Sequence, residues 1–233
     1  DGNVGTVNLP VFFCSFDGKS YALDANVVFA DNMEAEDLGK TIKEQLDAGK
    51  TNIKLILASD AGENVFAIIK DALYGGTAGS INLSLIGCKE IPTKGLSNWD
   101  GKLDALKSIY LPDITRIGVE GLAYCVYLEE INTPNVTSIH ENAFGGCTNL
   151  QKITFGELTE VKGLSHDYDG ILDPGVDTER INLVLSENQK VMTKNRQGNE
   201  YFWTPTKEYY KGSVEYGIPS FLEYKFNSVS LKK

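Results

Sequence analysis

Cysteine, histidine and aspartate are the residues of this chain that could do chemistry, and their spacing decides which chemistry. Cys125 and Cys147 stand 22 positions apart inside two similar phrases, residues 114–133 and 136–155, where paired thiols could form a disulfide or bind a metal ion. The four cysteines include no C-x-x-C pair, however, and free cysteine packs as a compact hydrophobe. We therefore predict that both are buried spacers.

The histidines and aspartates point to no catalytic motif. His140 and His166 lie in no recognised nucleophile or metalloprotease pattern, so we expect neither to be catalytic and His140 to be exposed. A Gly-bearing acidic stretch could bind Ca²⁺, but Ile171 stands at the next ligand position of an EF-hand loop, which favours a solvated loop. Its acids are Asp167, Asp169, Asp173 and Asp177. We expect no cofactor and no metal.

Charge and hydropathy exclude several classes of protein. The 233 residues carry a net charge of -10, which would repel a nucleic-acid backbone at long range. No apolar run approaches the ~18 residues that span a bilayer. The sequence starts at Asp1, so any signal peptide or lipid anchor would already have been removed. We expect a soluble protein without a transmembrane segment that binds no nucleic acid.

An internal repeat predicts the strands and turns that position the cysteines, histidines and aspartates. The pattern L-x-x-I followed by T-x-(I/V) recurs at a shift of 22 from Leu106, Leu128 and Leu150. Short runs of alternating apolar residues extend the series in both directions, and such runs predict strands with one buried face. We expect their first isoleucines to stack in a single column of a parallel sheet: Ile53, Ile81, Ile109, Ile131, Ile153 and Ile181. The opposite wall should be helical or irregular, with a helix over 65–73 that ends before Gly75.

The repeat resembles that of the BspA-like leucine-rich proteins of bacterial surfaces. The pattern L-x-x-I-x-L-P-x-x-x-T-x-I-G-x-x-A-F-x-x-C-x-x-L is matched best from Leu128 to Leu150, which includes ENAFGGC, and more loosely over about residues 53–185. His140 stands where the pattern has Gly, and Leu122 where it has Phe. The resemblance implies an α/β fold: a right-handed leucine-rich-repeat solenoid with parallel strands stacked on one side, capped at both ends.

Three segments follow from this interpretation. Residues 1–50 form an N-terminal cap, built from a hairpin around Asp17-Gly18 and a helix between Asn32 and Lys50. Residues 51–185 form the leucine-rich repeats. Residues 186–233 form an aromatic-rich C-terminal cap, which the final stretch FLEYKFNSVSL can close with a strand.

The resemblance implies a non-catalytic protein that mediates adhesion by binding an extracellular or host protein. It also implies an extracellular or cell-surface location, with a lipid on a removed N-terminal segment as one anchoring mode. The candidate binding site is the outward row of the sheet, Lys54, Asn82, Tyr110, Asn132 and Thr154, with Ser108, Glu130 and Lys152 in the next row. A plain solvated face is the alternative for these residues. A glycan binder that uses C-terminal aromatics such as Trp203, or an enzyme, are alternatives for the protein.

Overall fold

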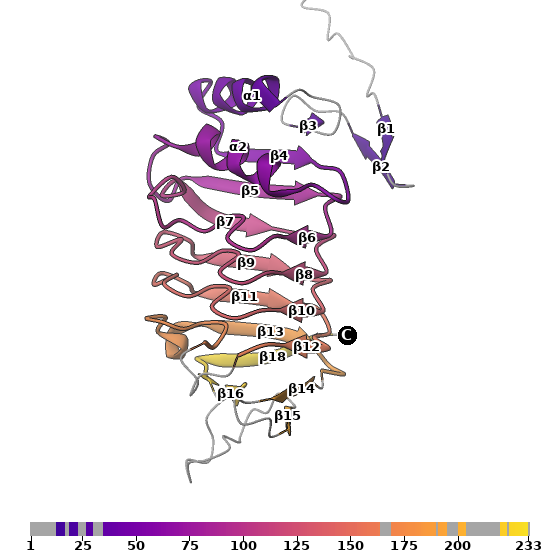
Figure 1. Cartoon of the computed structure of the whole chain (residues 1–233), viewed down its shortest axis with the longest axis vertical. Coiled ribbons are helices and arrows are strands. Elements are labelled where there is room, and N and C mark those ends of the chain that lie inside the picture. The colour runs from indigo at the N-terminus through magenta and orange to yellow at the C-terminus, as the bar shows by residue number, and fades with distance from the viewer. Residues whose placement is uncertain are drawn as a thin grey trace, which may run out of the picture.

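The largest element of the fold is an eight-stranded sheet in which every neighbouring pair of strands is parallel (Figure 1). The computed structural model describes residues 13–16, 19–22, 27–29, 35–163, 169–189, 191–194, 200–203, 220–222 and 224–232. In spatial order the strands are β18 (Ser228–Lys232), β13 (Asn182–Ser186), β11 (Lys152–Phe155), β9 (Glu130–Thr133), β7 (Leu106–Tyr110), β5 (Ile81–Ile86), β4 (Asn52–Ile56) and β3 (Val27–Phe29). The predicted mixed α/β fold with a parallel sheet is confirmed.

The wall predicted to be helical or irregular is α2 (Glu63–Leu73) in the first rung and turns at residues 119–124 and 141–146 in later rungs, as expected. Between these turns and the large sheet, along the chain, lies a second, smaller sheet that the sequence did not predict. Its members are β6 (Glu90–Ile91), β8 (Arg116–Ile117), β10 (Ser138–Ile139), β12 (Glu160–Val161), β14 (Val191–Lys194) and β15 (Glu200–Trp203). Four of these strands are only two residues long, which is too short to show an alternation pattern. All neighbouring pairs are parallel except β14 and β15.

From β5 to β14 the chain alternates between the two sheets and adds one strand to each as it advances. We call the segment from one strand of the large sheet to the next a rung. Threonines link the rungs at the entry to the small sheet: the Thr137 hydroxyl donates 3.2 Å to the Thr115 carbonyl, and the Thr159 hydroxyl donates 3.3 Å to the Thr137 carbonyl. The repeated threonine therefore connects neighbouring rungs by a side-chain hydrogen bond.

The buried column of the large sheet differs from the predicted one at two positions. Ile53 pairs with Leu83 rather than Ile81, and Ile153 pairs with Leu183 rather than Ile181. The observed column is Ile53, Leu83, Ile109, Ile131, Ile153, Leu183 and Val229. A slip of two residues keeps every side chain on its own face, so an alternating pattern cannot detect it. The lengths of the connecting segments set the register instead. They place Leu83 opposite Ile53 and Leu183 opposite Ile153, and in both pairs the partners are 30 positions apart in the sequence.

Two helices lie beside the N-terminal strands. The predicted helix within Asn32–Lys50 is α1 (Ala35–Asp47), and the one predicted over 65–73 is α2 (Glu63–Leu73). Leu38 and Ile42 of α1 are buried in the same core as Phe66 of α2, since each helix turns one apolar face inward. Asn32, the predicted cap residue, lies outside the described residues.

A hairpin precedes the large sheet, and β3 extends it. β1 (Phe13–Phe16) and β2 (Lys19–Ala22) pair antiparallel around Asp17-Gly18, as the sequence predicted. β3 pairs parallel with β4 and becomes the first strand of the large sheet. The N-terminal segment therefore contributes backbone hydrogen bonds to the stack.

The far end of the large sheet is formed by residues distant in sequence. β18 pairs parallel with β13, which confirms the predicted closing strand, and it lies beside β13 in Figure 1. Just before it, β16 (Ser220–Phe221) and β17 (Tyr224–Lys225) form a small antiparallel pair. Phe221, Tyr224 and Phe226 are buried in the core, so these members of the aromatic tail are packing residues.

The acidic loop packs in part against this aromatic tail. The Tyr224 hydroxyl donates 3.0 Å to Oδ2 of Asp173, and burial raises the pKa of this carboxyl. His166 and Asp167 lie outside the described residues. Within the described segments, no three His, Cys, Asp or Glu side chains gather into a group that could hold a metal ion. Tyr224 thus ties one of the four aspartates to the fold.

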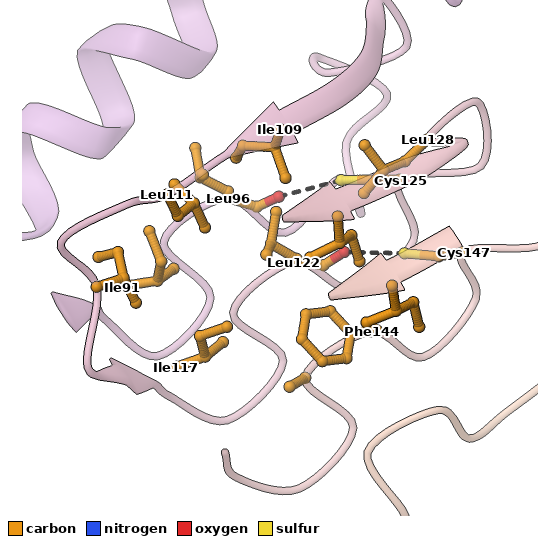
Figure 2. Packing of buried hydrophobic residues seen from close by; sticks show 14 of the residues in the cluster. Ile91, Leu96, Ile109, Leu111, Ile117, Leu122, Cys125, Leu128, Phe144 and Cys147 are labelled. Atoms are coloured by element: carbon orange, nitrogen blue, oxygen red, sulfur yellow. Dashed lines mark hydrogen bonds between the residues drawn. The ribbon is translucent and has the colours of Figure 1, made fainter. Parts of the chain in front are cut away.

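Cys125 and Cys147 occupy equivalent core positions in consecutive rungs. Both are free and buried, as predicted. The Cys125 thiol donates to the Leu96 carbonyl at 3.3 Å, and the Cys147 thiol donates to the Leu122 carbonyl at 3.1 Å. Figure 2 shows the two bonds running side by side among the buried aliphatic side chains. Cysteine thus fills a small space and also satisfies a carbonyl of the preceding rung.

His140 is buried, with 6% of its surface exposed, so the prediction of an exposed histidine was wrong. The reason is the unpredicted small sheet, on which Arg116 and Glu160 flank the ring. Arg116 Nε donates 3.3 Å to Nε2 of His140, which requires a neutral ring, and Glu160 Oε2 lies 3.9 Å from the same nitrogen. Burial lowers the pKa of His140, and repulsion from Arg116 and Lys162 lowers it further against the weaker pull of Glu141 and Glu160.

We predict that the buried thiols resist modification in the folded protein. Burial raises the pKa of Cys88 to about 12, and the neighbouring Cys147 thiol together with burial raises the pKa of Cys125. Because all three sulfur atoms are buried from the reagent, iodoacetamide at pH 8 should modify Cys88, Cys125 and Cys147 at least about tenfold more slowly in native than in guanidinium-unfolded protein. Peptide mass spectrometry measures this site by site. A Cys125–Cys147 disulfide peptide would contradict the spacer role.

We predict that His140 makes the fold less stable in mild acid. Its pKa in the folded state lies below the unfolded value of about 6.5, so the unfolded chain binds the extra proton. The free energy of unfolding should therefore fall as the pH drops below about 6.5, until the folded ring also becomes protonated. Urea unfolding at pH 7.5 and 5.5 should show a smaller loss for His140→Gln than for the natural chain. Equal losses of unfolding free energy in both proteins would show that the His140 ring does not contribute to the pH dependence of stability.

Candidate functional site: the outer face of the large sheet

The outer face is the side of the large sheet that points away from the buried column, and its side chains form two columns in register. The first column is Asn52, Asn82, Ser108, Glu130, Lys152, Asn182 and Ser228. The second is Lys54, Ser84, Tyr110, Asn132, Thr154, Val184 and Ser230. With six strand spacings of ~4.8 Å between their seven members, the columns are about 29 Å long.

All eight predicted site residues lie on this face, but two predictions about them need correction. Asn82 belongs to the column of Ser108, Glu130 and Lys152, and Ser84 takes its place beside Tyr110. The cause is the same two-residue slip that displaced Ile81. Thr154 is only 6% exposed, because its short side chain lies between Asn132 and Val184 in the column.

Hydrogen bonds tie the first column together across the strands. Asn82 Nδ2 donates 3.0 Å to Asn52 Oδ1, and the Ser108 hydroxyl donates 2.7 Å to Asn82 Oδ1. Further along, Lys152 Nζ lies 2.7 Å from Glu130 Oε1. Such bonds restrict side-chain rotamers before any partner arrives, which lowers the entropy cost of binding.

The second column supplies the main apolar contact of the face. Tyr110 is 43% exposed, and Ser84 and Asn132 flank it on the two adjacent strands. A tyrosine with polar neighbours offers both apolar area and a hydroxyl, the combination common at the energetic centre of protein interfaces. Tyr110 is therefore the largest exposed side chain with apolar area in the two columns.

The chemistry of the two columns suits binding. They contain neither histidine nor cysteine, and their one carboxylate, Glu130, is paired with Lys152. The Ser108 hydroxyl donates to an amide oxygen rather than to a base, so it is not activated as a nucleophile. The face offers hydroxyls, amides, one ion pair and one aromatic ring.

Sequence reasoning missed several members of the face. Ser84, Asn52 and Asn182 complete its columns, and each alternates with buried apolar residues within its strand, so the signal was present in the sequence. It also missed Trp99, which is 61% exposed and lies outside the sheet, in the rung between β5 and β7. That rung has 26 residues between Leu83 and Ile109, compared with 22 between Ile109 and Ile131, a difference that marks an insertion.

The aromatics proposed for glycan binding at the C-terminus lie largely outside the described region. Tyr209, Tyr210 and Tyr216 are not among the described residues, and only the backbone of Trp203 is described, in β15. Among the described helices, none is both long and apolar enough to cross a bilayer.

Comparison with known proteins gives one match. Residues 101–165 match the family described as the BspA type leucine rich repeat region, with six copies of the repeat. No curated protein and no solved structure matches the chain. The matched segment contains β7 to β12, which include the middle strands of both sheets and the residues Ser108, Tyr110, Glu130 and Lys152 of the outer face. Residues 101–165 are therefore similar to a BspA-type leucine-rich repeat region.

Proposed function

We propose that this chain is a non-catalytic, surface-exposed repeat protein that binds an extracellular protein through the outer face of its large sheet. The observation that carries the proposal is the two-column array itself: polar side chains held in register, partly by bonds to one another, around the exposed ring of Tyr110. Repeat families use such stiff, extended surfaces to bind other proteins.

The size of the face agrees with that use. Strands of four to six residues give it a width of about 13–20 Å beside its length of about 29 Å, and a stable interface needs about 800 Å² from each partner. The flat projection is about 400–600 Å², so a partner would have to cover the whole face, with the relief of its side chains, to approach that area. The central position of Tyr110 would then be well shielded from water.

The finer features of the proposal rest on the repeat family. Turns stacked through the parallel strands of two sheets support a right-handed solenoid, with the β1–β2 hairpin and α1 at one end and β16 to β18 at the other acting as caps. Members of the family are generally surface-associated, which supports an extracellular location, adhesion and attachment through a lipid. The three-segment division at residues 50 and 185 is part of the same proposal.

We predict that a triple change on the outer face abolishes partner binding. Tyr110→Ala, Asn132→Ala and Lys152→Ala together remove the central ring, an amide and one half of an ion pair. Against a panel of purified extracellular host proteins in surface plasmon resonance, the natural chain should bind at least one protein with a micromolar or lower Kd. The triple variant should bind it at least about a hundredfold more weakly, since a few central residues carry most of the energy of an interface.

A matched variant controls for general surface changes. Tyr127→Ala, Asn188→Ala and Lys162→Ala alter the same three residue types at exposed positions outside the two columns. This variant should keep the natural affinity, and circular dichroism should show that both variants melt as the natural chain does. Unchanged binding by the first variant, or equal loss by both, would rule out the outer face as the site.

A further inference from the structure

Trp99 forms an aromatic platform on the wall of the repeats that the proposed function does not use. Its ring centroid lies 3.7 Å from that of Tyr124 at an interplanar angle of 41°, and its Nε1 donates 3.0 Å to Glu120 Oε2. With one side against Tyr124 and its polar edge bonded, the ring is held in place while 61% of its surface stays in water. These two contacts fix the orientation of the exposed indole ring, which single exposed apolar side chains at a protein surface do not require.

The loop that carries Trp99 is also rigid. Asn98 is buried, its Oδ1 accepts 2.6 Å from the Leu103 amide, and its Nδ2 donates 2.9 Å to Asp104. These bonds close the extra residues of the 26-residue rung into a compact turn. By its backbone bonds Asn98 corresponds to Tyr124 of the next rung, so Trp99 takes the position of Cys125 and turns outward instead of into the core.

A polar hollow of about 320 Å³ adjoins the platform, between α2 and the segment 93–102. Its charged lining residues are Glu63, Lys70, Asp71, Lys94, Asp100 and Lys102. Lys94 Nζ lies 3.5 Å from Glu120 Oε2, the same oxygen that accepts the Trp99 indole proton. The aromatic face and the hollow are therefore parts of one continuous surface.

The charges of this surface largely cancel. Lys102 Nζ lies 2.6 Å from Asp71 Oδ1 and 3.6 Å from Asp100 Oδ2, and Lys70 Nζ lies 3.8 Å from Asp100 Oδ1. With Glu120 the surface holds four carboxylates and three ammonium groups. Such groups can donate and accept hydrogen bonds, but they attract neither a strong anion nor a strong cation.

We propose that this surface binds a neutral polysaccharide, with a sugar ring stacked on Trp99 and hydroxyls directed into the hollow. A pyranose has an apolar C–H face and a polar rim, which match the indole face and the adjacent charged groups. A protein hot spot fits less well, because the centres of protein interfaces are depleted in charged residues. The chain's net charge of -10 disfavours sulfated or other polyanionic glycans.

The test uses the full chain and hexasaccharides of glucose and xylose with β-1,4, β-1,3 or α-1,4 linkages, titrated by isothermal calorimetry. At least one should bind with a Kd of about 1 mM or lower, and Trp99→Ala should weaken it at least about tenfold. Trp99→Phe should keep part of the affinity, because a smaller aromatic face remains. Tyr110→Ala, on the outer face, should bind as the natural chain does. Trp99 is exposed, so the variants should keep the natural melting temperature.

Three results would overturn the proposal. These are the absence of binding to any neutral hexasaccharide, binding that Trp99→Ala leaves unchanged, and binding only to a heparin hexasaccharide titrated alongside the neutral sugars. Loss of affinity for a protein partner on Trp99→Ala, without any sugar binding, would also count against it and would identify a protein site. Because Trp99 lies off the outer face, this test succeeds or fails independently of the triple variant.

Discussion

Parallel backbone hydrogen bonding between neighbouring rungs is the constraint on which the rest of this structure depends, and in the large sheet its register shifts only at Ile81/Asn82 within the described strands. Ile109, Ile131 and Ile153 lie directly opposite one another, so each buried side chain packs on its counterparts above and below. A slip of one residue in any rung would turn its apolar side chains to water and its polar ones to the core. At ~1.5–3 kcal/mol for each fully buried aliphatic side chain, that slip would cost far more than the backbone bonds alone could recover.

Side-chain bonds between rungs reinforce this register at the corners of each turn. Hydroxyls of Thr137 and Thr159 and thiols of Cys125 and Cys147 each donate to a carbonyl of the preceding rung. The Thr115 and Thr137 carbonyls also accept backbone amides of the next rung, whereas the Leu96 and Leu122 carbonyls lie in turns outside both sheets and accept the buried thiols. Buried polar groups without partners are costly, and a small donor at a repeated position removes that cost in every turn.

The rungs differ in length, and these differences determine which surfaces the molecule presents. Equal 22-residue rungs give an outer face with side chains in regular columns, centred on Tyr110 and Asn132. The 26-residue rung before Ile109 must place its extra residues outside the stack, and Asn98 closes them into the turn that presents Trp99. The regular part of the repeat thus provides one candidate surface, and its interruption provides another.

The sequence alone determined the parallel sheet, both helices, the hairpin, the closing strand and the core cysteines, because period-two and period-3.6 patterns and a 22-residue shift report directly which side chains are buried. It also identified residues of the outer face, since polar positions alternate with buried ones. Only the tertiary structure decided the partners across strands. It placed Ser84 rather than Asn82 beside Tyr110, buried Thr154 and His140, and brought two-residue strands together as a second sheet. Those outcomes depend on contacts between rungs. The alternation of apolar and polar residues within a strand is unchanged by a two-residue shift in register, and a two-residue strand is too short to show any alternation.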